Sequence, residues 1–200
     1  MNIPARHLIF VVLMVLGSAT GAIRAQDATD KESANLPHPG SIQAVMDSMY
    51  NVHPGASYVS VNCVQWMDQL LRKAGFKVTP DFSKQVRIAT FSKEEKAELS
   101  KHVLNSDPRT TGAPGAIVAS GQGTWVELKK AAPGDIVQYW YNGGANGHTG
   151  VVETVGTNGR VTLYGSHKSA GGVGRLETSL AHASKVRVYV ARPGNNLQGR

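Results

Sequence analysis

The 200-residue chain has a single cysteine, Cys63, and after residue 16 it has no apolar run long enough to cross a membrane. One cysteine cannot form an internal disulfide, and it cannot build a thiolate zinc site. Its His, Cys, Asp and Glu residues show no metal-ligand spacing, and no basic run is interleaved with aromatic residues. These absences argue against a metal, a cofactor, nucleic acid and stable membrane insertion.

The N-terminus has the plan of a signal peptide. Arg6 and His7 precede the apolar run LIFVVLMVL at residues 8–16, and small residues follow up to Ala22 and Ala25. The run is too short for a stable membrane helix, and the small residues suit signal peptidase. We therefore predict cleavage after Ala22 or Ala25 and an exported protein, either periplasmic or secreted.

Charge and length indicate one basic domain. The formal net charge is +7, and removal of residues 1–25 takes away Arg6 and Arg24 and no acidic residue, which leaves +5. A basic exported protein suits an anionic polymer such as the cell envelope. From polarity and apolar patterning, we expect a disordered leader over 26–40, one domain over 41–193 and a flexible tail over 194–200.

The stretch over residues 57–76 places Cys63 at the start of a helix. Asn62 can cap the helix, Gln65 stands in capping-box spacing, and Gly75 is a C-terminal stop signal. A thiol in the first turn faces free backbone N–H groups and the positive end of the helix dipole, which favour the thiolate. We therefore expect the pKa of Cys63 to lie well below about 8.5. The alternative is a buried cysteine that serves only packing.

The segments around this helix divide into a helical and a β-rich part. Before and after it, the patterns predict a helix over 41–50 capped by Ser41, a surface helix over 92–104, a loop over 107–115 and short strands over 116–118 and 124–128. The β-rich runs 135–141, 150–155, 160–164 and 185–191 predict an antiparallel meander. The turn TNGR at 157–160 predicts a hairpin that brings His148 and His167 close together.

A cysteine nucleophile needs a base within hydrogen-bond reach and a polar group that orients this base. We assign Cys63 as nucleophile, His148 as general base and then acid, and His167 as orienting residue. Ser166 or Tyr164 could take the third place instead. The backbone N–H of Cys63 and a neighbouring donor would hold the oxyanion.

Four motifs in order resemble the NlpC/P60 cell-wall peptidases and the related CHAP amidases. They are NCVQWMDQLLRKAGF at 62–76, APGDIV at 132–137, GHTGVV at 147–152 and YGSH at 164–167, followed by a Gly-Val pair at 172–173. The match covers about residues 41–193. The stretch 77–120 is an insertion relative to a minimal member, and we expect it to shape the substrate groove.

The resemblance implies a papain-like α+β fold, with the cysteine helix packed on an antiparallel sheet. It also implies hydrolysis of amide bonds in peptidoglycan peptides by Cys63, His148 and His167. Members of the family often place a tyrosine upstream of the cysteine to help hold the oxyanion, and Tyr50 and Tyr58 are the candidates here. We expect a monomer whose partner is peptidoglycan or its stem peptides.

The residues leave several alternatives open. Trp140 ends a predicted strand beside the site and could stack on sugar or stem peptide, or it could pack in the core. The bond could be that of an endopeptidase or of an amidase. An acyltransferase would use the same three residues, and a non-catalytic envelope-binding module could retain the fold. The protein could remodel its own cell wall or act as a toxin.

Overall fold

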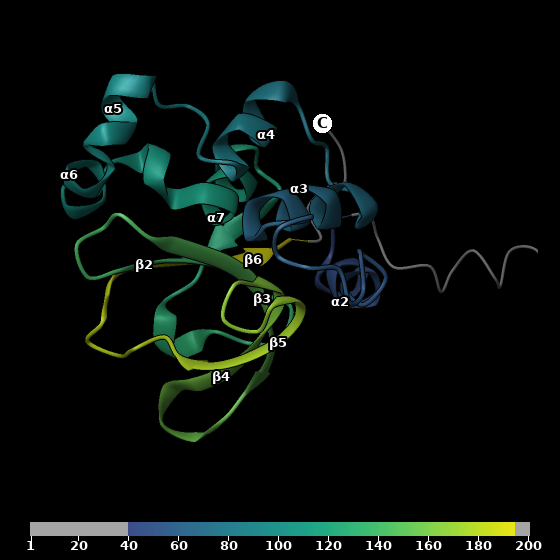
Figure 1. The fold of residues 1–200 in the computed structure, drawn as a ribbon. Coiled ribbons are helices and arrows are strands. Elements are labelled where there is room, and N and C mark those ends of the chain that lie inside the picture. Colours follow the sequence, from purple (N-terminus) through teal and green to yellow (C-terminus); the bar gives the residue numbers. More distant parts are fainter. Residues whose placement is uncertain (1–39, 195–200) are drawn as a thin grey trace, which may run out of the picture. The chain divides into compact units, whose positions relative to one another are not determined.

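A six-stranded antiparallel sheet carries helices on one face in the computed structural model, which describes residues 40–194 (Figure 1). The sequence-based α+β class is confirmed. The predicted signal peptide, nearly all of the leader and the last six residues lie outside the described residues. The helices are α2 (Ile42–Met49), α3 (Cys63–Lys73), α4 (Pro80–Val86), α5 (Lys93–Ala97), α6 (Leu99–Leu104) and α7 (Gly112–Ala119), with 3-10 turns η1 (Pro108–Thr111), η2 (Leu128–Lys130) and η3 (Thr157–Gly159).

The strands are β1 (Gly123–Trp125), β2 (Ile136–Tyr141), β3 (Gly147–Val155), β4 (Arg160–His167), β5 (Gly172–Ser179) and β6 (Lys185–Pro193). They lie in the order β1-β6-β2-β3-β4-β5. The predicted meander is thus correct for β2, β3 and β4, but its fourth strand is wrong. β5 pairs with β4, and β6 pairs with β2 on the opposite side. The sequence GVGRLETS hides β5 because its glycines are typical of a turn.

Helix α3 has the ends that the sequence predicts. Asn62 and Gln65 form both bonds of the capping box, and Gly75 adopts a φ of 83°. The N–H of Phe76 donates to the carbonyl of Leu71, which closes the C-terminus in a Schellman motif. Four side chains of α3 are fully buried against the sheet, namely those of Trp66, Met67, Leu70 and Leu71. This packing fixes the helix N-terminus, and so Cys63, on the sheet.

A buried carboxylate ties α3 to α4. The Asp68 side chain is 1% exposed and accepts hydrogen bonds from Ser83 Oγ at 2.7 Å and Arg87 Nη2 at 2.6 Å. Burial alone would raise the pKa of Asp68, but these bonds outweigh burial and lower it. These two hydrogen bonds therefore hold the start of the insertion against the cysteine helix.

Three expectations for residues 77–130 are wrong. The predicted surface helix is broken at Glu98 into α5 and α6, and the predicted loop contains η1 and the start of α7. Residues 116–118 belong to α7 and not to a strand. α4 had not been predicted, although Thr79 caps it and Pro80 occupies its first turn, a common helix start. Of the predicted strand over 124–128, only its first two residues pair, in β1.

Tertiary packing explains why α7 is a helix despite its β-branched residues. Its sequence GAPGAIVA is small and apolar, and it packs between α4 and the sheet. A Cβ on Gly115 would come within 1.8 Å of Thr111 Oγ1. Only glycine allows this close approach, and the burial gained outweighs local strand propensity.

The segment Ala132–Ile136 fixes the start of β2. Asp135 is fully buried and accepts two hydrogen bonds from Arg192 of β6, each at 2.9 Å. Its Oδ2 also accepts the Ala132 N–H at 2.8 Å. Gly134 has a φ of 87°, and a Cβ there would lie 2.4 Å from Ile42 Cγ2. The motif therefore joins β2, β6 and α2. Among residues 40–194, no helix has the length and apolar character of a membrane span.

Candidate functional site

The end of the β3–β4 hairpin brings the two predicted histidines together. Nε2 of His148 lies 2.7 Å from Nδ1 of His167, and the ring centroids are 4.6 Å apart. The two residues are only 8% and 1% exposed. In the pairing of β3 with β4, Val151 lies opposite Tyr164. The same register, extended to the strand ends, places His148 opposite His167. The sequence-based expectation of their proximity is confirmed.

Both imidazoles are neutral in this environment. Burial lowers the pKa of His148 to about 3, with a further contribution from His167. Burial also lowers the pKa of His167, although the carbonyls of Leu163 and Gly174 partly offset it. Within residues 40–194, Nε2 of His167 is buried without a hydrogen-bond partner of good geometry.

The 2.7 Å contact between the rings needs one imidazole to donate and the other to accept. When His148 donates from Nε2, Nδ1 of His167 is the acceptor and Nε2 of His167 carries its proton. Nδ1 of His148 then carries a free lone pair. His148 can therefore act as a base through Nδ1 while His167 fixes its tautomer.

Cys63 lies in the first turn of α3 and is 6% exposed. Backbone N–H groups of Thr149, Val64 and Cys63 itself are directed at its Sγ. The backbone N–H of Thr149 is available to the thiol because the pairing between β3 and β4 begins only at Val151. The thiol therefore lies against the residue next to His148.

The expected pKa of the thiol is wrong for this state of the protein. Burial raises the pKa of Cys63, and the three N–H groups and Tyr58 offset the effect only in part. The helix N-terminus stabilises a thiolate as predicted, but the sheet seals the turn from water. No hydrogen bond joins Cys63 to His148 among the residues described, and the pKa shifts of both groups favour their neutral forms.

Tyr58 is the tyrosine that lies beside the thiol. Its Oη is 3.9 Å from Cys63 Sγ, and burial and the thiol raise the pKa of Tyr58 to about 12. The N–H of Tyr58 donates to Gly171 at 3.0 Å, and the N–H of Val173 donates to Ala56 at 2.9 Å. This short pairing with the start of β5 holds Tyr58 beside Cys63.

Tyr50, the other candidate, belongs to a different cluster. Its Oη donates to Glu153, which lies five residues along β3 from His148. Arg175 also binds this carboxylate, with Nε at 2.8 Å from Oε2 and Nη2 at 2.7 Å from Oε1. Tyr50 therefore lies at the opposite end of β3 from Cys63.

Two further candidates have partners of their own. Trp140 is 4% exposed, and its indole N–H donates to the Thr110 carbonyl at 2.9 Å. This favours the alternative of core packing over contact with a substrate. Ser166 Oγ donates to the Val61 carbonyl and not to His148. Of the three candidates for the third position, His167 is the one bonded to His148.

Sequence reasoning missed Tyr139, which packs against His148. The two residues are cross-strand partners, their ring centroids are 5.5 Å apart, and Tyr139 is fully buried. Lys185 Nζ lies 4.9 Å from the centroid of the Tyr139 ring. The alternation of side chains along β2 determines the face of the sheet on which Tyr139 lies. This alternation points to His148 only once the pairing of β2 with β3 is known. Tyr139 packs with apolar side chains such as Val137 and Leu163, and it contacts the imidazole from that side.

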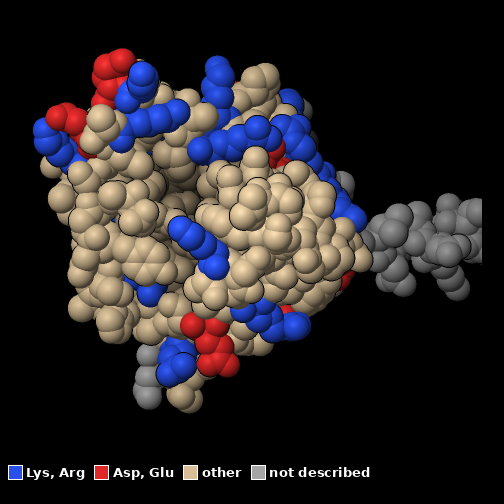
Figure 2. All heavy atoms as spheres, in the orientation of Figure 1, with Lys and Arg blue, Asp and Glu red and all other residues tan. Residues whose placement is uncertain are grey.

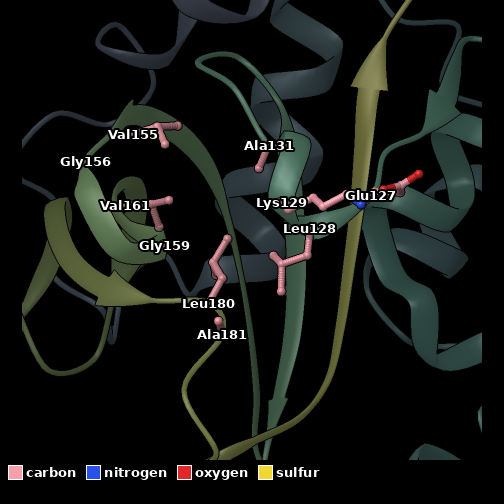
Figure 3. A pocket seen from close by; sticks show the side chains of 10 residues that line it. All are labelled: Glu127, Leu128, Lys129, Ala131, Val155, Gly156, Gly159, Val161, Leu180 and Ala181. Carbon is pink, nitrogen blue, oxygen red and sulfur yellow. Dashed lines mark ion pairs between the residues drawn. The ribbon is translucent and has the colours of Figure 1, made fainter.

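A separate cavity of about 600 Å³ lies away from these residues (Figure 3). Aliphatic side chains of Leu128, Val155, Val161 and Leu180 line it, and neither Cys63 nor the histidines contribute to its walls. Among residues 40–194, no group of three or more His, Cys, Asp or Glu side chains could hold a metal ion.

Comparisons with known proteins find no match. The chain matches no protein-family model, and searches of curated proteins and of solved structures likewise identify no similar protein. The resemblance to NlpC/P60 and CHAP enzymes therefore rests on the four sequence motifs alone.

Proposed function

We propose that this protein is an exported cysteine hydrolase that cleaves amide bonds in peptidoglycan peptides, on a papain-like α+β fold. The observation that carries the proposal is the meeting of three elements. Cys63 at the start of α3 lies against Thr149, and the adjacent His148 is bonded to His167 at 2.7 Å. A nucleophile, a base and an orienting group are thus brought together from distant parts of the chain.

The neutral state of the site defines the first step. As Sγ attacks the substrate carbonyl carbon, its proton passes to Nδ1 of His148, and His167 Nδ1 accepts a hydrogen bond from Nε2–H of the resulting imidazolium. The backbone N–H of Cys63 and the hydroxyl of Tyr58 are the donors available to the oxyanion. His148 then protonates the leaving amine as the C–N bond breaks, which leaves a thioester.

Water completes the reaction. His148 takes a proton from water as the water oxygen attacks the thioester carbonyl carbon, and the C–S bond then breaks as His148 returns this proton to Sγ. Because Cys63 is 6% exposed, its surroundings have to open for a substrate to reach Sγ. The Tyr58 hydroxyl, 3.9 Å from Sγ, stays within reach of the oxyanion in this proposal.

Surface charge supports a wall polymer as partner. Lys and Arg outnumber Asp and Glu on the face drawn in Figure 2, in keeping with a net charge of +7. Peptidoglycan and its associated polymers carry carboxylate or phosphate groups. A basic surface raises the local concentration of such an anionic substrate.

A second candidate is a non-catalytic envelope-binding module. It is favoured by the raised pKa of Cys63 and by the lack of a Cys63–His148 hydrogen bond among the described residues. On this hypothesis the two histidines and the thiol are remnants within a stable core.

Digestion of purified, unmodified peptidoglycan distinguishes the two. We expect the protein to release fragments that mass spectrometry assigns to endopeptidase or amidase cleavage. Cys63→Ala should release none, while His182→Gln, which changes an exposed histidine, should match the unaltered protein. Product formation only with an added amine would indicate an acyltransferase. Equal sedimentation with the wall and no cleavage by any variant would contradict the hydrolase and favour the binding module.

A further inference from the structure

A groove of about 690 Å³ lies beside α4, α7 and η1, in the part of the chain that we expect to be an insertion. α4 and α7 lie close together on the helical side of the sheet (Figure 1). Phe82 and Ala116 contribute apolar walls, Gln85 and Thr90 contribute polar groups, and Trp125 of the edge strand β1 stands at the groove. None of these residues belongs to the site of Cys63.

Trp125 is unusual among the tryptophans of the chain. It is 50% exposed, whereas Trp66 and Trp140 are 0% and 4% exposed. The Tyr189 ring lies beside it, with centroids 6.2 Å apart. When a ligand with a flat apolar face stacks on an exposed aromatic ring, apolar surface of the ring is removed from contact with water. The electron-rich face of indole also attracts polarised C–H groups. The C–H faces of sugar rings have this character.

The polar side of the groove is rigid and keeps unused hydrogen-bonding groups. Gln85 Nε2 donates to Pro108 O, Arg109 O and Thr111 Oγ1 at 3.1 to 3.2 Å, which holds η1 in place. Among the described residues, Oε1 of Gln85 accepts no hydrogen bond, and the buried Thr90 Oγ1 has no partner. The wall thus offers the Gln85 acceptor to a ligand, and a ligand group that reaches the buried Thr90 Oγ1 would supply its missing hydrogen bond.

The charges at the groove are already paired. Lys84 and Asp81 form an ion pair at 3.3 Å, and Arg109 binds Asp107 and Glu95, each at 2.8 Å. An anionic ligand would find no uncompensated cation among these side chains. The groove therefore favours a neutral, polar ligand with an apolar face over a phosphate or a carboxylate.

We propose that this groove binds a neutral glycan, with one sugar ring stacked on Trp125 and its hydroxyl or acetamido groups bonded to Gln85 and Thr90. The identity of that glycan as the sugar strand of the cell wall rests on the proposed function. The groove would then hold the glycan backbone while Cys63 acts on the attached peptide. A neutral peptide in the groove is the competing occupant that the test has to distinguish.

Collisional quenching of tryptophan fluorescence by acrylamide tests the site, with chitotetraose, the β-1,4-linked tetramer of N-acetylglucosamine, as probe. Because two tryptophans are buried, quenching reports mainly on Trp125. We expect chitotetraose to lower the quenching constant about twofold in a saturable manner. The Cys63→Ala variant should respond equally, which separates glycan binding from hydrolysis. The absence of protection at millimolar chitotetraose would overturn the proposal even if the hydrolase were established.

Variants locate the binding. Gln85→Ala and Thr90→Val should each weaken chitotetraose binding about tenfold, the effect of losing a hydrogen bond to a rigid polar wall. Trp125→Ala should abolish binding in calorimetry, and Tyr141→Phe, a change at a half-exposed aromatic outside the groove, should leave it unaltered. Unchanged affinity in Gln85→Ala and Thr90→Val would overturn the assignment, and so would protection by a neutral tetrapeptide without protection by the sugar.

Discussion

The two ends of β3 bury titratable groups in opposite ways. At one end, Glu153 is 8% exposed and its charge is matched by Arg175 and by the hydroxyl of Tyr50. At the other end, His148 and His167 are at least as buried as Glu153, and they face each other without a charged partner. β3 thus carries a group of fixed charge near one end and a neutral imidazole near the other.

The difference separates structural from chemical use of a buried group. Burial by itself would raise the pKa of Glu153, but the bonds to Arg175 and Tyr50 outweigh burial and lower it, so the carboxylate keeps one charge state. Burial lowers the pKa of His148 to about 3 with no compensation. A neutral imidazole keeps a free lone pair, whereas a paired carboxylate keeps its charge and serves to hold elements together.

The largest expected effect comes from removing the base. His148→Gln keeps a side chain of similar polarity but cannot take the thiol proton, so hydrolysis of peptidoglycan should fall by about 10³-fold. Release of soluble fragments over time measures it, with His182→Gln as control. Activity within tenfold of the unaltered protein would exclude His148 as the general base.

Stability against pH sharpens the contrast between the two ends. Because the folded pKa of His148 is depressed, the unfolded chain binds more protons between pH 6.5 and 3, and the fold loses stability as pH falls through this window. From pH 7.5 to 5 the loss should be about 2 kcal/mol, and His148→Gln should avoid it. Urea unfolding at the two pH values measures it. Identical losses in both proteins would show that His148 is not buried as a neutral ring.

The Glu153 end should respond in a different pH range. Its folded pKa is lowered, so its stabilising contribution is present above an unfolded value of about 4.5 and is lost as pH falls through the folded pKa. Glu153→Gln should destabilise the fold at pH 7 by about 1 kcal/mol, a modest value because the Arg175 partner is 62% exposed. Thermal unfolding at pH 7 and pH 3 should show the difference shrinking in acid. A constant difference would contradict the ion pair as its source.

The smallest expected effect concerns Tyr58. Its hydroxyl lowers the pKa of Cys63 through a long contact of 3.9 Å, so Tyr58→Phe should shift the thiol titration slightly upward. The rate of iodoacetamide alkylation against pH measures this shift. In the unaltered protein the rate should rise only at a pH above that of an ordinary thiol. A midpoint below pH 8.5 would instead support the thiolate that the helix N-terminus alone predicts.

Local signals were sufficient for the cysteine helix and for the His148–His167 hairpin. Asn62 and Gln65 specify a capping box, and the turn at 157–160 specifies a hairpin, because each depends on residues close in sequence. The same signals placed Cys63 and the two histidines in the correct elements before any long-range contact was known.

Long-range contacts account for what the sequence could not show. α7 is helical because its small residues pack between α4 and the sheet, and β6 lies between β1 and β2 because of pairing across most of the domain. The burial that raises the pKa of Cys63 likewise arises from the sheet that covers the helix turn. Secondary-structure propensity and the spacing of residues in the sequence do not show such long-range contacts directly.

The position of β6 has a consequence for the order of folding. β6 is the last strand in sequence, yet it separates β1 from β2, and Arg192 from this strand neutralises the buried Asp135. During synthesis the chain therefore keeps two strand edges and a carboxylate without partners until residues 185–193 have emerged. The sheet cannot close before this segment is delivered, so a slow release of the segment would prolong exposure to proteases and to misassociation.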